Sequence, residues 1–379
     1  MSKNGKQTRS RTRYDIVIVG AGISGLTLAE RYSGLGKKVL IIESRDHIGG
    51  NCYDYINDDG ILVSRYGPHY FHTNDKEVWD YIHKFSQWEP YEHRVIAHVD
   101  GKEVPIPINI KTVNALFGLS IRSQAQMRRW LKENVPDIPS PKNAEEAAIA
   151  RVGNVIYEKI FKGYTKKQWD KDPRDLSQEI TNRIPVRIND DDRYFVDKYQ
   201  ALPKYGYTKF FEKMIEKKNI HIMLNTTWDD IKSKITYSDK LFFTGRIDSY
   251  FNNIFEPLEY RSLRFEFETL SQEHFQRYAQ ENYPSENIPF TRIVEYKVAT
   301  GQKSPKTTIS REFPTWDGDP YYPVLSKRNQ KLYKKYQKAA NSLQKDNIYF
   351  VGRLANYKYF NMDQAFKNAL DLFRELNSI

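Results

Sequence analysis

The sequence has one cysteine, Cys52, and no long apolar run. A single thiol excludes an intramolecular disulfide and is typical of a protein kept in a reducing compartment. No apolar stretch approaches the roughly 20 residues that a membrane-spanning helix needs, and the N-terminus has no apolar signal-peptide core. We therefore expect a cytoplasmic protein without membrane insertion.

Acidic residues are fewer than basic ones, at 48 Asp and Glu against 59 Lys and Arg, which gives a net charge of +11. Residues 1–13 carry five basic side chains and no acidic one, which leaves +6 for the rest. No aromatic residue or periodicity accompanies these charges, so we expect a disordered basic tail and no nucleic-acid partner. The diffuse remaining excess suits a phosphorylated small-molecule substrate.

The 379 residues exceed what one hydrophobic core usually supports, so two or three packed parts are expected. The hydrophobic pattern predicts a βαβ unit, then a helical region, two regions of short antiparallel strands, and a final strand, glycine turn and amphipathic helix. In that order, the predicted ranges are strand 15–19, helix 24–32 and strand 38–42; helices within 109–175; strands within 183–207 and 249–323; and the final elements within 346–376. Ser140 and Asn143 are candidate helix caps.

A glycine-rich turn follows the first predicted strand in "RYDIVIVGAGISGLTLAERY". Gly20, Gly22 and Gly25 form GxGxxG, with Ser24 inside the turn, and such a turn exposes backbone to a pyrophosphate at a helix N-terminus. Glu43 ends the second strand 23 positions after the first glycine, where a carboxylate can accept ribose hydroxyls. The pattern predicts dinucleotide binding, with FAD and NAD both open at this point.

Two further segments favour FAD over NAD. "ESRDHIGGNCYDY" places Arg45 and the pair Gly49 and Gly50 just after the ribose acid, where flavoenzymes of the glutathione-reductase type wrap the longer cofactor. "FVGRLANY" places Gly352 and Arg353 after a distal strand, where an arginine can pair with the FAD pyrophosphate.

The HxxH pair in "YGPHYFHTND", His69 and His72, raises the question of a metal site. No third ligand follows at zinc spacing, and one cysteine adds nothing. The acidic run 190–192 is interpreted as a solvated turn. No metal is therefore expected.

Nine ordered segments resemble the UDP-galactopyranose mutases, from about residue 14 to the C-terminus. They are "HIGGNCYDY", "YGPHYFHTND", "FKGYTKKQW", "RIPVR", "ALPKYGYTK", "LEYRSLRFE", "IPFTRIVEY", "DPYYPV" and "GRLANYKYFNMDQA". The resemblance implies an α/β protein with a Rossmann-like FAD-binding domain, an inserted helical domain and an antiparallel-sheet domain. The implied ranges are 14–78, 208–250 and 340–379 for the FAD-binding domain, 108–183 for the helical domain, and 79–107, 184–207 and 251–339 for the sheet domain.

The resemblance implies a mutase that interconverts the pyranose and furanose forms of a UDP-linked galactose or a close relative, with no net redox change. Attack of reduced FAD through N5 on the anomeric carbon would release UDP, after which the sugar ring opens and recloses through another hydroxyl. The cofactor is then the nucleophile, so the protein must chiefly hold a detached diphosphate. A homodimer is a further family expectation.

The resemblance also implies roles for individual residues. Arg187 and Arg292 would hold the diphosphate with tyrosine hydroxyls, and His69 and His72 would lie beside the isoalloxazine and tune it. The implied catalytic set is Arg187, Arg292, His69, His72, Tyr321 and Tyr359. The implied cofactor-binding residues are those named above together with Asn51, Asn361 and Met362. The implied substrate-binding set is Phe161, Tyr164, Thr165, Gln168, Trp169, Tyr194, Tyr199, Asn282 and His93, with Tyr164 stacking on the uracil.

Some residues depart from the family pattern and leave alternatives open. Pro68 and Tyr70 flank His69 where a small and an aliphatic residue are usual, and Asn361 and Asp363 replace an acid and a histidine. These changes put the sugar and the base in question: an N-acetylated, 6-deoxy or pentose sugar, and uracil or thymine. Without the resemblance, the arginines would be surface ion pairs and the aromatic residues helix or sheet packing. An FAD-dependent oxidoreductase of the amine oxidase type is the alternative function.

Overall fold

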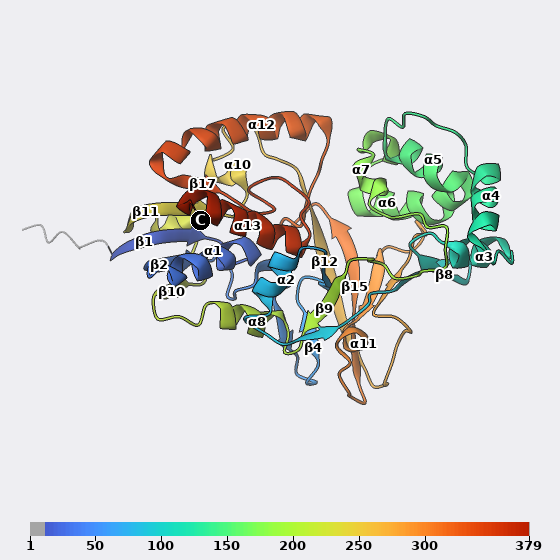
Figure 1. Ribbon diagram of the computed structural model, residues 1–379, viewed down its shortest axis with the longest axis horizontal. Helices are drawn as coiled ribbons and strands as arrows, with labels where there is room; N and C mark the ends of the chain where they lie inside the picture. The colour runs from blue at the N-terminus through green and yellow to red at the C-terminus, as the bar shows by residue number, and fades with distance from the viewer. Residues whose placement is uncertain (1–11, 379) are drawn as a thin grey trace, which may run out of the picture. The chain divides into compact units, whose positions relative to one another are not determined.

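The first two strands and the helix between them form the βαβ unit that the sequence predicts (Figure 1). The computed structural model describes residues 12–378, so the predicted basic tail lies almost wholly outside the described residues. β1 (Thr12–Val19) and β2 (Val39–Ile42) pair in parallel on either side of α1 (Ile23–Gly34) in the chain. All four residues of β2 are buried, as expected for a parallel strand covered on both faces.

Three further strands complete this parallel sheet, whose order is β10-β2-β1-β11-β17. The C-terminal helix α13 packs on α1, side by side with it in Figure 1. The remaining elements of this part are α8 (Tyr207–Met214), β10 (Ile220–Met223), α9 (Trp228–Ile231), β11 (Ile235–Phe243), α10 (Ile247–Tyr250), α12 (Lys327–Ser342), η4 (Gln344–Asp346), β17 (Ile348–Phe350) and α13 (Met362–Asn377). The final strand, turn and helix are thus confirmed.

A seven-stranded sheet dominates the other part of the chain, in the order β16-β12-β15-β14-β13-β7-β8. All its neighbours are antiparallel except β7 and β13. Its strands are β7 (Val95–Val99), β8 (Lys102–Ile106), β12 (Tyr260–Leu270), β13 (Gln280–Asn282), β14 (Arg292–Glu295), β15 (Thr307–Thr315) and β16 (Tyr322–Pro323). Smaller sheets join β3 (Asp54–Ile56) to β4 (Leu62–Ser64), and β5 (Phe71–Thr73), β9 (Tyr199–Pro203) and β6 (Trp88–Pro90) in the order β5-β9-β6. Short helical elements of this part are η1 (Gly50–Cys52), α2 (Lys76–Ile82) and α11 (Tyr296–Thr300).

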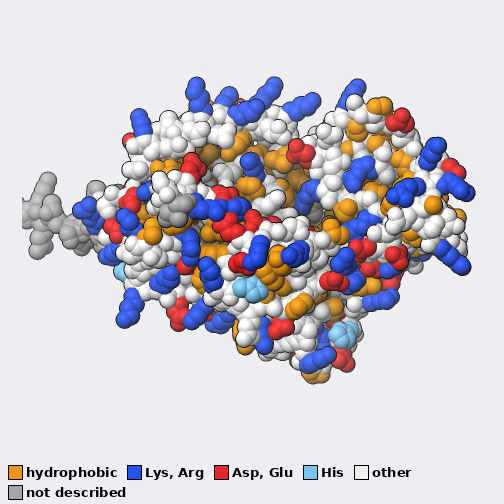
Figure 2. Space-filling model, in the orientation of Figure 1, with side chains coloured by type: hydrophobic (Ala, Val, Ile, Leu, Met, Phe, Trp, Pro, Cys, Tyr) orange, Lys and Arg blue, Asp and Glu red, His pale blue; other side chains and the backbone are white. Residues whose placement is uncertain are grey.

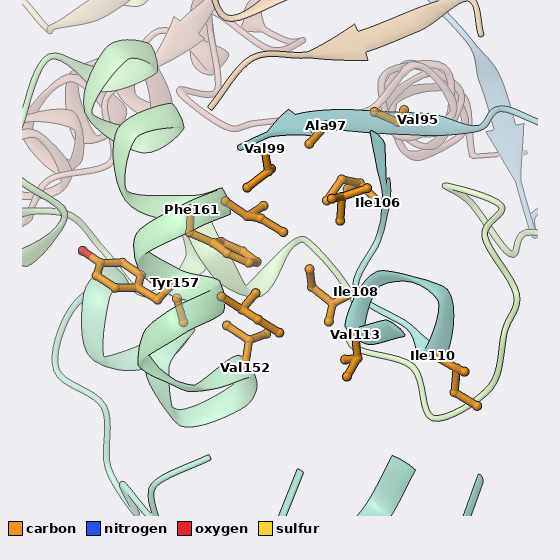
Figure 3. Close-up of a cluster of buried hydrophobic side chains, with 14 of the residues drawn as sticks. Val95, Ala97, Val99, Ile106, Ile108, Ile110, Val113, Val152, Tyr157 and Phe161 are labelled. Atoms are coloured by element: carbon orange, nitrogen blue, oxygen red, sulfur yellow. The ribbon is translucent and has the colours of Figure 1, made fainter. Parts of the chain in front are cut away.

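The region predicted to be helical is helical, and it packs on β7 and β8 (Figure 3). Its elements are α3 (Ile110–Phe117), α4 (Gln124–Asn134), α5 (Ala144–Ile156), η2 (Tyr157–Lys162), α6 (Gly163–Trp169), η3 (Pro173–Asp175) and α7 (Glu179–Asn182). Asn143 caps α5 by accepting from the Glu146 amide, as predicted, whereas Ser140 lies outside the helix. Val99, Val152 and Phe161 point into one hydrophobic cluster in Figure 3.

Contacts divide the chain into two compact units: residues 1–50, 208–255 and 335–379 form the first, and residues 51–207 and 256–334 form the second. Residues 51–78 therefore group with the second unit, although the sequence assigned them to the FAD-binding domain. The three-domain division remains a prediction. The prediction of strands within 183–207 is confirmed at β9, whereas 183–198 holds only the isolated bridges of Val186 and Arg193.

Charged side chains of both signs mix over most of the visible surface, but Lys and Arg line the edge where α12 lies (Figure 2). Lys331, Lys334, Lys335 and Lys338 on this helix are exposed. Across residues 12–378, no helix is both long and apolar enough to cross a bilayer.

Candidate active site

The glycine turn between β1 and α1 has no room for side chains. Gly20 has φ +104°, and a Cβ there would lie 2.1 Å from Thr244 Oγ1. A Cβ on Gly25 would lie 2.0 Å from the Gly20 carbonyl oxygen. The first turn of α1 holds no acidic residue, so among the described residues of this helix nothing repels an anion at its N-terminus. The turn therefore fits a pyrophosphate on bare backbone.

Glu43 ties the end of β2 to this turn. Its Oε2 accepts from the Ala21 amide at 2.7 Å, and its Oε1 accepts from the Arg45 amide at 2.9 Å. Gly49 donates to the Ala21 carbonyl at 2.8 Å, and a Cβ on Gly50 would lie 3.0 Å from Gly22 Cα. Ser44 Oγ also donates to Oε1, at 3.2 Å. The carboxylate is fixed by these bonds, and Oε2 keeps a second lone pair for a ribose hydroxyl.

The distal segment after β17 meets the same turn within the first unit. Gly352 has φ +99°, and a Cβ there would lie 2.9 Å from Ser24 Oγ. Arg353 donates through Nε to the Phe360 carbonyl at 3.1 Å, and its guanidinium lies 4.8 Å from the centre of the Tyr359 ring. Asn361 and Met362 then begin α13. The bare glycines, the fixed acid and the nearby arginine together fit an FAD pyrophosphate and ribose.

In the second unit, Arg292 begins β14 and lies opposite Glu312 of β15 in the antiparallel register. Its Nε donates to Glu312 Oε2 at 2.6 Å and its Nη1 to Gln280 Oε1 at 3.4 Å. The Arg292 side chain is 20% exposed and the Glu312 side chain 1%. Burial opposes the charge on Arg292, but Glu312, Tyr164 and Tyr322 raise its pKa well above the usual value. Arg292 is therefore a fixed, fully charged cation.

An aromatic and imidazole stack adjoins this ion pair. The rings of Tyr70 and His93 are 3.8 Å apart and 23° from parallel, and the Tyr91 hydroxyl is hydrogen-bonded to His93 Nδ1 at 3.2 Å. Burial, with the charge of Arg292, lowers the pKa of His93 to about 3. Burial raises the pKa of Tyr70 well above its usual value, and its hydroxyl has no partner among residues 12–378. His93 is therefore neutral at physiological pH.

Arg187 is held by backbone instead of by a carboxylate. Its Nη1 donates to the carbonyls of Asp191 at 2.8 Å and Arg193 at 2.5 Å, and its Nη2 to that of Tyr194 at 3.4 Å. The Asp191 carboxylate is 3.8 Å away and is itself held by Arg193. Burial lowers the pKa of Arg187. Its carbonyl partners carry no formal charge, so its positive charge is only weakly compensated.

His72 and His69 lie in and before β5. His72 Nδ1 is 2.9 Å from Asp197 Oδ2, and its ring stacks on Phe195 at 3.6 Å. His69 Nδ1 is 3.0 Å from the Gly67 carbonyl. Residues 12–378 contain no group of three His, Cys, Asp or Glu side chains placed to hold a metal ion.

A family model described as UDP-galactopyranose mutase matches residues 159–359, and a model for an NAD(P)-binding Rossmann-like domain matches residues 18–85. The chain belongs to the UDP-galactopyranose mutase family. A probable UDP-galactopyranose mutase of Klebsiella pneumoniae is 37% identical over 94% of this chain and 93% of the relative. A dTDP-fucopyranose mutase of Escherichia coli is 34% identical over 94% of this chain and 96% of the relative.

Solved structures agree on the fold. A reduced UDP-galactopyranose mutase superposes with a TM-score of 0.77 at 18% identity, covering 96% of this chain and 94% of that one. A putrescine oxidase superposes with a TM-score of 0.59 at 12% identity, covering 97% of this chain and 100% of that one. The predicted family, the mixed α/β fold with a Rossmann-like domain and the assignment as an isomerase of the mutase type are confirmed. Family and fold also support FAD as the cofactor.

The segment predicted to bind the uracil lies on and before α6. Tyr164 is among the groups that raise the pKa of Arg292, so these two predicted residues interact electrostatically. Phe161 and Trp169 are 3% and 6% exposed in hydrophobic clusters, which favours the packing alternative for both. Thr165 is buried, and the Gln168 carbonyl accepts from Arg261 Nε at 2.9 Å.

Of the other predicted mutase residues, one lies beside Arg292 and the rest lie elsewhere. Asn282 ends β13 directly opposite Arg292. Tyr199 stacks on Trp79 with ring centres 4.7 Å apart. Tyr194 packs on the helical core, Tyr321 is 5% exposed beside aromatic rings, and Asn51 lies in η1. Their proposed roles remain predictions.

Sequence reasoning missed Glu312 and Gln280, the two residues that orient Arg292. The register of β14 on β15 and of β13 on β14 brings them to it. Strand alternation around Glu312 could have indicated an inward-facing acid, but only the strand pairing says which cation it meets.

Proposed function

We propose that this chain interconverts the pyranose and furanose forms of a UDP-linked sugar, UDP-galactose or a close relative. The observation that carries the proposal is Arg292, charged, largely buried and fixed through Nε by Glu312. Nη2 makes no hydrogen bond with the described residues, so it is available to a phosphate oxygen. A fixed guanidinium binds a phosphate group strongly and directionally.

Reduced FAD, when bound, supplies a nucleophilic N5 for the anomeric carbon. The chain's own residues bind the cofactor at Gly20, Gly22 and Glu43 and hold the departing nucleoside diphosphate at Arg187 and Arg292. Tyr164 is a platform for the base, and a stacked ring supplies roughly 1–3 kcal/mol. A neutral His93 and the Tyr70 ring exclude water beside Arg292, which strengthens its attraction for the diphosphate.

The experiment is product analysis with dithionite-reduced enzyme on a panel of UDP- and dTDP-sugars. We expect a furanose product from UDP-galactopyranose or a close relative, and none from the oxidised enzyme. An amine oxidase type of reaction would instead oxidise a substrate and consume oxygen. Failure of every nucleotide sugar to isomerise would contradict the proposal.

We propose that Asn361 contributes to the choice of sugar, because a neutral residue stands where the family usually has an acid. Asn361 is the N-cap of α13, and its amide donates to Gln364 Oε1 at 2.9 Å. Asp caps helices as well as Asn does, so Asn361→Asp leaves stability unchanged. We expect a shift toward galactose in kcat/KM ratios across the panel, and Asn361→Ser is the matched neutral control. Unchanged ratios would exclude this residue as a selector.

The predicted homodimer remains a prediction. A solution mass near twice the 44.8 kDa of one chain would support it.

A further inference from the structure

The loop between β13 and β14 encloses the ammonium group of a lysine from a different element. Lys167 of α6 donates through Nζ to four backbone carbonyls of this loop: Tyr283 at 2.5 Å, Ser285 at 2.8 Å, Ile288 at 2.9 Å and Phe290 at 2.8 Å. An ammonium has three N–H donors, so four acceptors share them. The loop is therefore folded around a single cation.

No carboxylate of the described residues forms an ion pair with Lys167. Glu286, within the loop, pairs instead with the neighbouring Lys166 at 3.5 Å. Burial lowers the pKa of Lys167 to about 8, opposed by the more distant charge of Glu286. The carbonyl dipoles are thus the main partners of this charge, and removing it would leave four carbonyls without their shared donor.

The same face of α6 is shaped to receive the loop. Gly163 lies four residues before Lys167, and a Cβ there would be 2.4 Å from the Pro284 carbonyl oxygen. At the other end of α6, Arg261 of β12 donates to the carbonyls of Gln168 at 2.9 Å and Lys167 at 3.4 Å. The N-terminal end of α6 is therefore packed closely against the loop, and its C-terminal half is bonded to the loop through Lys167 and to β12 through Arg261.

The loop connects two residues of the proposed substrate site. Asn282 precedes it and Arg292 follows it, opposite each other in the ladder. The Tyr283 amide donates to the Thr291 carbonyl at 2.9 Å and closes the neck of the loop. The loop therefore ends directly at the strand position of Arg292.

We propose that Lys167 is a positioning residue that joins the nucleoside-binding helix α6 to the diphosphate-binding strand β14 by organising the loop 283–291 around its ammonium group. The inference rests on the proposed function, since Arg292 and Tyr164 take their roles from it. Lys167 itself touches neither substrate nor cofactor in this role. Lys167 acts by holding the distance between Tyr164, which stacks on the base, and Arg292, which binds the diphosphate.

The test compares Lys167→Met with Lys166→Met in the full-length flavoprotein. Lys166 is the neighbouring lysine, and its exposed pair with Glu286 contributes little. For Lys167→Met we expect faster hydrogen exchange in amides 283–291, UDP affinity weaker by about ten-fold, and kcat/KM lower by about a hundred-fold, as a displacement near 1 Å produces. The flavin spectrum and FAD content should stay unchanged. Lys166→Met should match the wild type in every readout.

Two further variants keep the proposal falsifiable. Gly163→Ala retains the lysine but pushes the loop away, so it should reproduce the exchange and UDP-binding defects. Lys167→Arg retains the charge, but its planar fork does not match four converging carbonyls, so it should restore binding only in part. Wild-type exchange and UDP affinity in both Lys167→Met and Gly163→Ala would overturn the inference. These two readouts do not require turnover, so they separate its failure from failure of the mutase proposal.

Discussion

Arg187 and Arg292 are the two cations assigned to the diphosphate, and their surroundings differ in charge. Arg292 is bound to a carboxylate that is 1% exposed, whereas Arg187 is bound to three backbone carbonyls. The first arrangement fixes the guanidinium but cancels much of its charge. The second leaves more of the charge available but depends on the conformation of a short segment. The comparison suggests that Arg292 supplies orientation and Arg187 supplies net attraction for the diphosphate.

The largest expected effect is that of Arg292→Ala, which removes the guanidinium that is fixed by a carboxylate. We expect kcat/KM to fall by about 10³ or more, because a bond to a charged leaving group is lost. The variant should still bind FAD and remain yellow, since the cofactor fingerprint lies in the other unit. Furanose product, measured by chromatography under reducing conditions, checks this. Wild-type turnover would mean that the diphosphate is not bound here.

The same substitution also leaves Glu312 buried without its cation. Breaking a buried pair in this way costs about 3–5 kcal/mol of unfolding free energy. The double variant Arg292→Ala with Glu312→Gln should regain much of that stability in urea titrations while remaining inactive. If stability and activity recover together, Arg292 has only a structural role.

Arg187→Met is the second test and should be less severe for activity, by about 10² in kcat/KM. The loss should be mainly in KM and in UDP affinity, because this arginine contributes attraction more than orientation. Its three carbonyl partners lie in partly exposed chain, so the stability cost should be about 1–2 kcal/mol. Calorimetric titration with UDP and urea unfolding measure both. A loss confined to kcat would reverse the assignment of roles.

The sequence predicted what depends on neighbouring residues along the chain. The glycine turn, the acid after β2 and the Asn143 cap were found because each is a short pattern with its own mechanism. The surroundings of Arg292 were not, because Glu312 is 20 positions away and meets it only through strand register. Strands were predicted within 183–207, where β9 forms one but the segment 183–198 does not. Its carbonyls at Asp191, Arg193 and Tyr194 bind the Arg187 side chain instead of a neighbouring strand.

Replacing Glu312 and Asp191 one at a time tests the same comparison, with smaller expected effects. Glu312→Gln should raise UDP affinity by up to about ten-fold, because a buried negative charge next to the proposed phosphate site is removed in poorly solvated surroundings. Asp191→Asn should change it less than about two-fold. The Asp191 side chain is 23% exposed, and solvent and Arg193 already screen it. Equal effects of the two variants would show that burial does not distinguish the two sites.

The smallest effect on activity should come from His93→Gln, which tests whether the surroundings of Arg292 are poorly solvated. Burial and Arg292 lower the pKa of His93 to about 3, whereas the unfolded chain takes up this proton near 6.5. The unfolded state therefore binds more protons than the folded state between those values, and His93 makes the protein less stable as the pH falls. From pH 7 to pH 5 this contribution is about 2 kcal/mol. Urea titrations at both pH values should show that loss reduced by about 2 kcal/mol in His93→Gln. Equal pH dependence in wild type and His93→Gln would mean that His93 takes up a proton as readily as it does in water. The surroundings of Arg292 would then be well solvated, and burial would not strengthen its attraction for a diphosphate.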